Sequence, residues 1–466
     1  MSATGIHAGA QSFAPGARTV FPTSAGMLLA VALAAHLAAA VNAIFGEGLA
    51  GATLFVTGQF ALSLALLRLY NGVWVLQDIR MPIVLFLFLY GATLPAISIL
   101  KGEELAGLTG AAFLFGTAFA GFNLVQWWHK QPWRNVTEEA FEGTRASFAS
   151  TILFLGSFVG LVAYAWSMGT REFLTLDRSQ MRWLYTQAWI VANMLINGFV
   201  MYLFAGWRQL SPAAKRITVV TIIMFVVLQL GLGNRHAFLP MFVFLAGVVA
   251  SRRRQVIGVR TILIAVFAFL LLMAVGVVRQ VRRAPWLAYS SQTLIGIAQH
   301  NEFTMPIQTV MYYLTTDKPL KYGASYLAAP EAFIPRSLWP EKPVSLSLEF
   351  SRDQFGDIIA TGYAYTPVTE AYVNFSYVGP FIILALVSLA TVALVKHARD
   401  KPMLYFLCFA LVIDFNRGES LSVLYPIAVT LFSFWLMSLI SRIDWVPSRS
   451  RRGSALELQG DGVTAV

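Results

Sequence analysis

The chain has too few charged residues to cover the surface of a water-soluble protein of its length. Only 12% of its 466 residues are charged, whereas 57% are hydrophobic, and soluble domains carry about twice that charged share. The single cysteine, Cys408, excludes an internal disulfide framework and a multi-cysteine metal site. The composition therefore predicts a protein that is dissolved in a lipid bilayer.

Sequence motifs for metals and nucleotides are missing as well. The chain has no His-Glu-x-x-His, no paired Cys/His spacing, no Asp-x-Asp and no glycine-rich phosphate loop, so we expect no metal and no cofactor. The net charge of +11 does not indicate nucleic-acid binding, because membrane proteins concentrate Lys and Arg in their cytoplasmic loops. We therefore expect the bilayer, and not nucleic acid, as a partner.

Long apolar runs are what the sequence has in abundance. The first run, 25–45, reaches about 31 Å as a helix, which matches the hydrocarbon core of a bilayer. No internal repeat of the kind found in many transporters is evident. We predict about twelve transmembrane helices, at 25–45, 49–70, 81–99, 106–126, 148–168, 183–206, 216–233, 236–250, 258–279, 376–396, 402–416 and 423–440.

The distribution of basic residues predicts the orientation of these spans. With the N-terminus inside, most of the 34 Lys and Arg residues fall in the inner segments, as the positive-inside rule requires. The fold class is therefore an all-α polytopic membrane protein with both termini in the cytoplasm. The predicted parts are a cytoplasmic tail 1–24, helices one to nine in 25–279, an extracytoplasmic loop 280–375, helices ten to twelve in 376–441 and a disordered cytoplasmic tail 442–466.

Three arginines break the charge rule at the outer end of the ninth predicted span. Arg279, Arg282 and Arg283 share one face if the helix continues. Their mutual repulsion calls for an anion among them, and guanidinium groups suit phosphate. Contact with phospholipid head groups, or with a carboxylate such as Glu302, is the structural alternative.

Two further polar groups lie at predicted outer helix ends. Arg235 ends the motif Gly-Leu-Gly-Asn-Arg at 231–235, where it either binds substrate or reaches the lipid head groups. Asp414 lies in an apolar span and needs a partner, for which Arg417 is the local candidate, since an unpaired carboxylate there costs about 2.5–3.5 kcal/mol. The pair is either a structural ion pair or part of a substrate site.

Glu370 is the lone charge in the aromatic stretch 361–380, just before the tenth predicted span. Apolar surroundings favour the protonated form of a carboxyl group, which suits general acid–base chemistry. The structural alternative is a helix-capping or hydrogen-bonded carboxylate. His300 and Glu302 are weaker candidates, because they lie on a predicted surface helix at 289–315.

Four local motifs resemble one bacterial family. They are Gly-Asn-Arg at 233–235, the segment Ile-Pro-Arg-Ser-Leu-Trp-Pro-Glu-Lys-Pro at 334–343, Thr-Glu-Ala-Tyr-Val-Asn-Phe at 369–375 and Asn-Arg-Gly at 416–418. Together with the long outer loop they resemble the Wzy-type polymerases of O-antigen and exopolysaccharide repeat units. Where such proteins commonly have Gly after Asn-Phe, this chain has Ser376.

The resemblance implies a membrane-embedded (GT-C-like) glycosyltransferase of the bacterial inner membrane. Its donor would be an undecaprenyl-diphosphate-linked oligosaccharide and its acceptor a sugar hydroxyl on a second lipid-linked unit, with the active site outside the cytoplasm. A chain-length regulator is an expected partner. Glu370 is predicted to be the base. Arg279 and Arg235 are the other predicted catalytic residues, which would stabilise the diphosphate. The further predicted diphosphate and sugar contacts are Arg282, Arg283, Arg417, Arg336, Trp339, Asn374 and His300.

Three other functions remain open on the sequence alone. An O-antigen ligase would use the same donor with a different acceptor, and it would leave long lipid-linked polymer in a deletion strain. A transporter or flippase of lipid-linked glycans would also have about twelve spans, but the large outer loop and the arginines near it argue against it. A structural or sensor protein predicts no glycan phenotype.

Overall fold

The computed structural model describes residues 22–72, 75, 77–133, 136, 138–141, 143–168, 187–232, 237–252, 303–334, 338–339, 341, 344–356 and 364–442. Within these residues the secondary structure is helical, without strands. Nine of the described helical segments are long and apolar enough to cross a bilayer. The prediction of an all-α, multi-pass membrane protein is therefore confirmed at this level.

The nine candidate spans coincide with nine of the twelve predicted segments. Of the other three, 236–250 corresponds to a helix of only 14 residues, α9 (Leu239–Arg252), and 258–279 lies outside the described residues. The predicted span 402–416 is not one helix, because the helix is interrupted at Leu411. Two shorter helices lie on either side of this residue, α18 (Pro402–Ala410) and α19 (Val412–Arg417). A continuous helix over those 15 residues was a wrong prediction, and the segment is shorter than an ordinary span.

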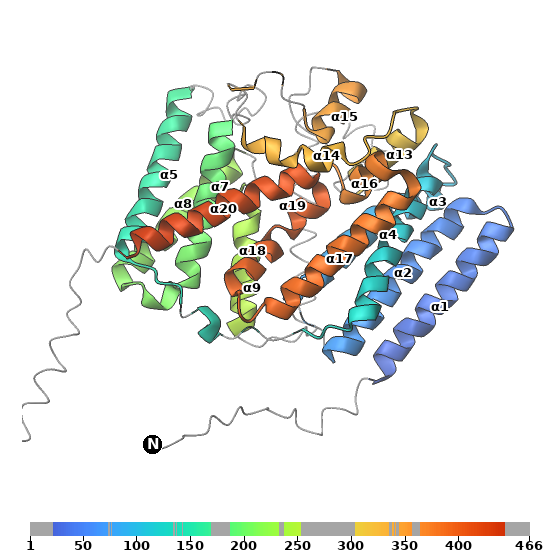
Figure 1. The fold of residues 1–466 in the computed structure, drawn as a ribbon, viewed down its shortest axis with the longest axis horizontal. Coiled ribbons are helices and arrows are strands. Elements are labelled where there is room, and N and C mark those ends of the chain that lie inside the picture. Colours follow the sequence, from blue (N-terminus) through green and yellow to red (C-terminus); the bar gives the residue numbers. More distant parts are fainter. Residues whose placement is uncertain are drawn as a thin grey trace, which may run out of the picture. The chain divides into compact units, whose positions relative to one another are not determined.

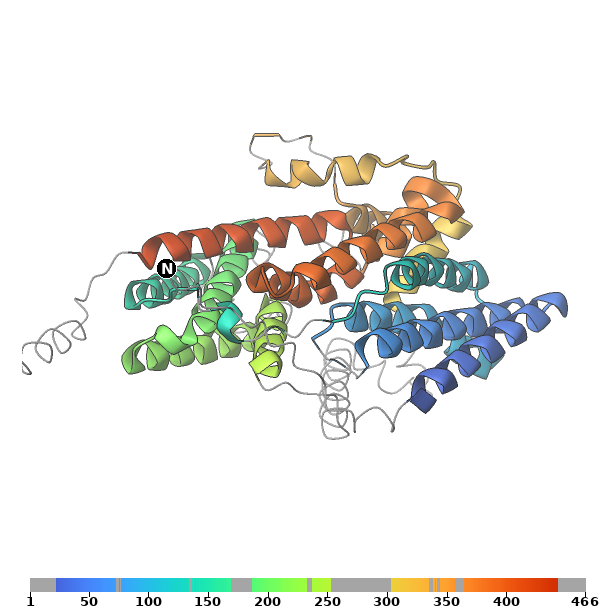
Figure 2. The ribbon, with the colours of Figure 1, turned by 60° about the horizontal axis from the view of Figure 1, so that its bottom comes forward.

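The described residues form two compact units, the first within 1–135, 254–398 and 412–423 and the second within 136–253, 399–411 and 424–466. In the first unit, α1 (Pro22–Ile44) packs on α2 (Gly48–Asn71), and α2 packs on α3 (Arg80–Lys101) and α4 (Leu108–His129). The helix α17 (Gly379–His397) lies along α4 (Figures 1 and 2). A Cβ on Gly121 would overlap the carbonyl oxygen of Phe381, so glycine permits the close approach of α4 and α17.

A buried ion pair joins four of these helices. Arg80 is fully buried, and its guanidinium binds both carboxylate oxygens of Asp78, at 2.8 and 2.6 Å. It also donates to Gln126 Oε1 at 3.0 Å, and Gln126 Nε2 donates to Ser388 Oγ of α17 at 2.8 Å. Asn71 Nδ2 completes this Asp78–Arg80 cluster by donating to Asp78 at 2.8 Å, so every charge in the cluster has an opposite charge or a hydrogen-bond partner.

The helices of the predicted outer loop lie at one end of the first unit. They are α13 (Met305–Thr315), α14 (Ala324–Leu327), η6 (Ala329–Phe333), α15 (Leu346–Phe355) and α16 (Pro367–Phe375). The helix α13 packs on the start of α4, where a Cβ on Gly107 would lie 3.0 Å from Thr315. A short 3-10 turn, η7 (Ser376–Val378), connects α16 to α17, and Ser376 has a left-handed φ of 56°.

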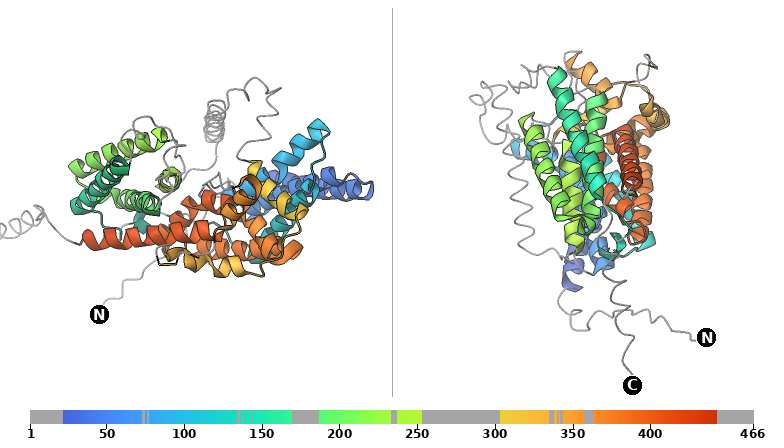
Figure 3. Two further views of the ribbon diagram at one scale, coloured as in Figure 1. Left: turned by 90° about the horizontal axis from the view of Figure 1, so that it is seen from above. Right: turned by 90° about the vertical axis from the view of Figure 1, so that its left-hand side faces the viewer.

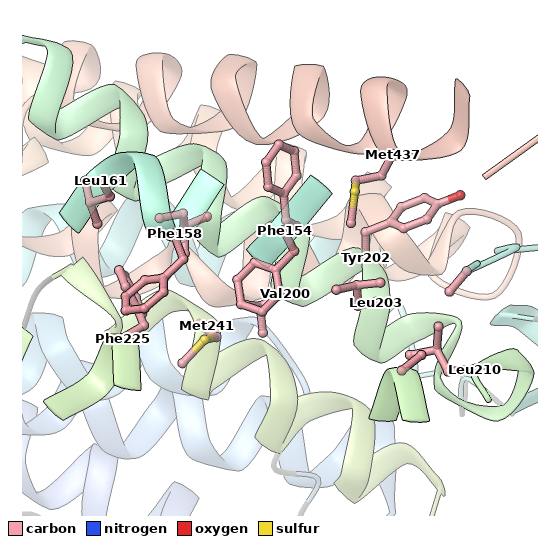
Figure 4. Packing of buried hydrophobic residues seen from close by; sticks show 14 of the residues in the cluster. Phe154, Phe158, Leu161, Val200, Tyr202, Leu203, Leu210, Phe225, Met241 and Met437 are labelled. Carbon is pink, nitrogen blue, oxygen red and sulfur yellow. The ribbon is translucent and has the colours of Figure 1, made fainter. Parts of the chain in front are cut away.

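The second unit contains η2 (Glu138–Phe141), α5 (Phe148–Met168), α7 (Gln187–Ala205), η4 (Trp207–Gln209), α8 (Pro212–Gly231), α9, α18 and most of α20 (Ser420–Ile440). The helix α5 packs on α7 and α8, which run beside it in Figure 3. Phe154, Phe158, Val200 and Phe225 form the centre of its apolar core, shown in Figure 4. A Cβ on Gly198 would lie 2.5 Å from Ser433, so glycine brings α7 close to α20.

Candidate functional site

Helix α16 places Glu370 inside the first unit. Thr366 caps the helix, because its hydroxyl accepts the amide of Thr369 at 3.0 Å, and Pro367 supplies a residue that fits the first helical position. Glu370 therefore falls in the first helical turn. Its side chain is only 2% exposed, so the carboxylate is removed from water and depends on neighbouring donors.

Three hydrogen bonds hold the Glu370 carboxylate. Oε1 accepts the hydroxyls of Ser325 and Ser420, both at 2.8 Å, and Oε2 accepts the backbone amide of Ser420 at 2.7 Å. Ser420 is the first residue of α20, where free amide groups and the helix dipole favour an anion. Glu370 therefore connects α14, α16 and the beginning of α20.

Asn374 and Tyr326 surround this carboxylate. Asn374 donates to Ser325 Oγ at 2.7 Å and accepts the amide of Gly323 at 2.9 Å, so it fixes the start of α14 beside Glu370. Tyr326 stacks on Phe375, with ring centroids 6.1 Å apart. Burial, with a smaller electrostatic contribution from Glu370, raises the pKa of Tyr326, so its phenol stays neutral.

A second buried carboxylate, Glu419, caps α15. Its Oε2 accepts the amide of Leu346 at 2.7 Å, and its Oε1 accepts the hydroxyl of Ser347 at 3.2 Å. Burial raises the pKa of Glu419 to about 6; the hydrogen bond from Leu346 opposes this shift, and the charge of Glu370 adds to it. The set of Glu370, Glu419 and their serine and amide donors is called the glutamate cluster below.

Aromatic and hydroxyl side chains enclose the glutamate cluster. Tyr365 is fully buried, and its backbone amide donates to the carbonyl of Arg417 at 3.1 Å. Its ring meets that of Tyr313 at 6.3 Å, edge to face, and burial raises the pKa of both phenols. The hydroxyls of Thr309 in α13 and Thr369 in α16 form a hydrogen bond of 2.8 Å. This bond connects α13 to the helix that carries Glu370.

The structure brings Arg417 to the same end of the unit. Arg417 ends α19, which contacts α16 and α3, and its side chain is half-buried. It lies near enough to Asp414, the predicted partner, and to Tyr90 to interact with both electrostatically. Of the predicted site residues, Glu370, Asn374 and Arg417 are therefore neighbours.

The remaining predicted site residues are Trp339 and six residues of which the structure gives no description. Trp339 is described and half-buried, without a contact that links it to Glu370. Six residues lie outside the described part of the chain: Arg235, Arg279, Arg282, Arg283, His300 and Arg336. Their predicted roles stay predictions.

The arrangement offers acid–base chemistry. Glu370 and Glu419 have no cationic partner within 4 Å among the described residues, and both depend on neutral donors. No group of three His, Cys, Asp or Glu residues in the described part of the chain is arranged to hold a metal ion. A carboxylate shielded from water and stabilised only by neutral donors is suited to exchanging protons with a substrate.

Five residues of the cluster were missing from the predicted site: Glu419, Ser325, Ser420, Leu346 and Ser347. In the sequence, Glu419 is only one of several polar residues close to Asp414. Ser325 lies 45 residues from Glu370 in the sequence, and Leu346 lies 73 residues from Glu419. No short motif connects such distant positions, so only the fold could reveal them.

The helices and the buried acids define a polytopic membrane protein with a polar site at one end of a helical unit. The family model of the O-antigen polysaccharide polymerase Wzy matches residues 178–444, more than half of the chain. The chain belongs to this family of polysaccharide repeat-unit polymerases, and the resemblance seen in the sequence is confirmed. No curated protein and no solved structure shows a significant match to the chain.

Proposed function

We propose that the protein joins lipid-linked oligosaccharide repeat units at the outer face of the bacterial inner membrane. The donor is a glycan on undecaprenyl diphosphate, and the acceptor is a sugar hydroxyl of a second lipid-linked unit. The proposed topology is a GT-C-like arrangement of about twelve spans with both termini in the cytoplasm, in which α18 and α19 together take the place of the eleventh span. The family match over residues 178–444, which includes both buried glutamates, is the observation that carries this proposal.

Glu370 is the proposed base. A carboxylate has about four acceptor positions, and three of those on Glu370 are used, two at Oε1 and one at Oε2. The remaining position on Oε2 accepts the proton of the acceptor hydroxyl as its oxygen attacks the anomeric carbon of the donor. The bond from that carbon to the diphosphate breaks, and undecaprenyl diphosphate leaves with the electron pair.

The leaving diphosphate needs positive charge, which arginine side chains supply in a metal-independent reaction. We assign this role to Arg235, Arg279, Arg282 and Arg283, with Arg417, whose carbonyl accepts the amide of Tyr365 beside the glutamate cluster, as a further candidate. Arg336, Trp339 and His300 are assigned to the sugar path. Asn374 is also assigned to substrate binding, and its side-chain amide donates a hydrogen bond to Ser325.

Replacing Glu370 tests the base directly. For Glu370→Gln we expect polymer formation to fall about 10²–10⁴-fold, the usual contribution of a general base, at normal protein abundance in the membrane. Glu370→Asp keeps a carboxylate and restores part of the activity. The matched control is Ser420→Ala, which removes one of the three hydrogen bonds to Glu370 and retains the base.

The structural alternative for Glu370 gives a different result. If the carboxylate only connects α14, α16 and α20, polymer and protein abundance fall together in Glu370→Gln, and the specific activity per molecule stays at the wild-type level. Repeat-unit polymerisation by membranes with matched amounts of protein separates the two outcomes, and unchanged specific activity would remove Glu370 from the reaction.

A surface-glycan gel on a deletion strain tests the function as a whole. We expect loss of the polymer ladder, accumulation of single repeat units and rescue by wild type but not by Arg279→Ala. Long lipid-linked polymer in the deletion strain would identify a ligase instead. Undecorated donor confined to the cytoplasmic face would identify a transporter, and a normal ladder would reject all three.

A further inference from the structure

A cleft of about 390 Å³ opens in the first unit beside α16. Its walls are the end of α13, the segment that follows it, and α16. Tyr372 and Val373 follow Glu370 in α16, and Glu370 itself is not among the lining residues. The residues that line the cleft are Tyr313–Leu320, Tyr372 and Val373.

The volume and lining of the cleft suit a small polar ligand. Ligand sites in proteins commonly measure about 300–1,000 Å³. Thr315 is the last residue of α13, and the last carbonyls of a helix have no partner within it. These carbonyls and the carboxylate of Asp317 accept hydrogen bonds, while the tyrosine rings supply apolar faces. Hydroxyl donors on a ring with apolar faces are the chemistry of a sugar.

The charges in and beside the cleft disfavour a diphosphate. Lys318 is the one basic residue of the lining, and its ammonium already binds Asp353 Oδ2 at 2.7 Å. Asp317 is exposed, and no described residue is paired with it. The one ammonium of the lining is therefore already neutralised by Asp353, and the lining offers no further cation to bind a phosphate group. The cleft therefore favours an uncharged part of the glycan over its lipid diphosphate end.

We propose that this cleft holds sugar residues of the glycan chain at a distance from the reaction site, which rests on the polymerase function proposed above. Tyr313 links the two places, because it lines the cleft and meets Tyr365 beside the glutamate cluster. A chain held in the cleft stays near the reaction site between additions. Weaker binding of the glycan chain in the cleft would shorten the polymer but would leave the transfer of a single repeat unit intact.

The test uses the full-length protein in lipid nanodiscs with lipid-free oligosaccharides released from the native polymer. Asp317→Ala removes an acceptor, and Pro319→Trp fills the cleft at an exposed position. We expect both variants to bind the oligosaccharide at least tenfold more weakly in calorimetry, and to make shorter chains in cells. Glu104→Ala, an exposed carboxylate elsewhere in the first unit, is the matched control and should bind as wild type does.

Wild-type oligosaccharide affinity in both cleft variants would overturn the proposal. Binding of inorganic pyrophosphate that is lost in Lys318→Ala would overturn it too, since the site would then recognise the diphosphate. The polymerase function fails separately. If the cleft variants lose oligosaccharide binding while a deletion strain keeps its ladder, the glycan site stands without the polymerase. If Glu370→Gln loses polymer while the cleft variants bind normally, only the cleft is rejected.

Discussion

The Asp78–Arg80 cluster and the glutamate cluster bury charge in the same unit in two different ways. In the first, the guanidinium of Arg80 lies 2.6 Å from Asp78 and both side chains are fully buried. In the second, Glu370 and Glu419 accept hydrogen bonds from hydroxyls and amides, without an ion pair among the described residues. Among the residues that the structure describes, the first cluster is balanced in charge and the second is not.

This difference separates a structural role from a chemical one. A balanced and fully hydrogen-bonded pair gains nothing from a change of protonation, so it is suited to holding α2, α3, α4 and α17 together. Carboxylates with only neutral donors bind protons more readily than usual, as the raised pKa of Glu419 indicates. Protein stability should therefore depend most on the first cluster and activity on the second.

The largest expected effect on stability comes from breaking the balanced pair. Arg80→Ala leaves Asp78 buried without its countercharge, which costs about 3–5 kcal/mol, and we expect the protein to be nearly absent from the membrane. Removing both partners in Asp78→Ala/Arg80→Ala leaves no uncompensated charge and should be less damaging. Thermal unfolding in detergent measures the stability of both variants. An equal loss of stability in the single and double variants would contradict the claim that the unpaired charge of Asp78 causes the damage.

A smaller effect is expected from the titration of Glu419. Because burial raises its pKa from 4.5 to about 6, the folded protein binds a proton that the unfolded chain releases. This contribution to stability is complete below pH 4.5 and is lost as the pH rises through 6, by about 2 kcal/mol. Unfolding measured across this range should lose that pH dependence in Glu419→Gln, and an unchanged slope would show that another group titrates.

Ser325→Ala tests how much a single hydrogen bond to Glu370 contributes to protein stability. It removes one of three donors to Glu370, and we expect a loss of about 1.5 kcal/mol, the lower end for hydrogen bonds to charged groups, since Ser420 still donates twice. The control is Ser157→Ala, whose hydroxyl bonds a carbonyl of its own helix at 2.8 Å. If both serine variants unfold alike in denaturant, Ser325 contributes nothing special to Glu370.

The smallest effect on protein stability is expected from the loss of a half-exposed ion pair. It serves as the reference against which the buried clusters are compared. Lys321 Nζ lies 2.7 Å from Glu349, with both side chains about 30% exposed. Solvent screens such pairs, so Lys321→Ala should cost about 0.2–1 kcal/mol. The loss should shrink further in high salt, whereas the cost of Arg80→Ala should not change. Salt-independent destabilisation of Lys321→Ala would mean that more than an ion pair is lost.

The sequence predicted the helices well because their signal is local. Nine described spans match runs of apolar residues, and Glu370 stood out as a lone charge in an aromatic segment. The break at Leu411 was missed because both short helices are apolar on either side of it. Hydropathy records the composition of a segment and not the continuity of its backbone.

The composition of the glutamate cluster could not be predicted for a different reason. Glu419 binds the start of α15, and an acceptor for a helix N-terminus can come from any part of the chain. Arg80 likewise lies just before the predicted span 81–99, where the sequence suggests a loop residue, whereas its side chain is fully buried against Asp78. Pairing between distant residues depends on the tertiary fold, which no motif of this sequence encodes.

The turn between α16 and α17 has a consequence for the depth of Glu370 in the membrane. Residues Pro367–His397 form one apolar segment of 31 residues, yet the chain turns at Ser376, and α17 alone has 19 residues, about 28 Å of helix. A Cβ on Gly379 would overlap the carbonyl of Ala371, so α16 is fixed against the first turn of α17. We therefore expect the depth of the carboxylate to follow how α17 is anchored between the two head-group layers, so that membrane thickness would act on the proposed reaction site.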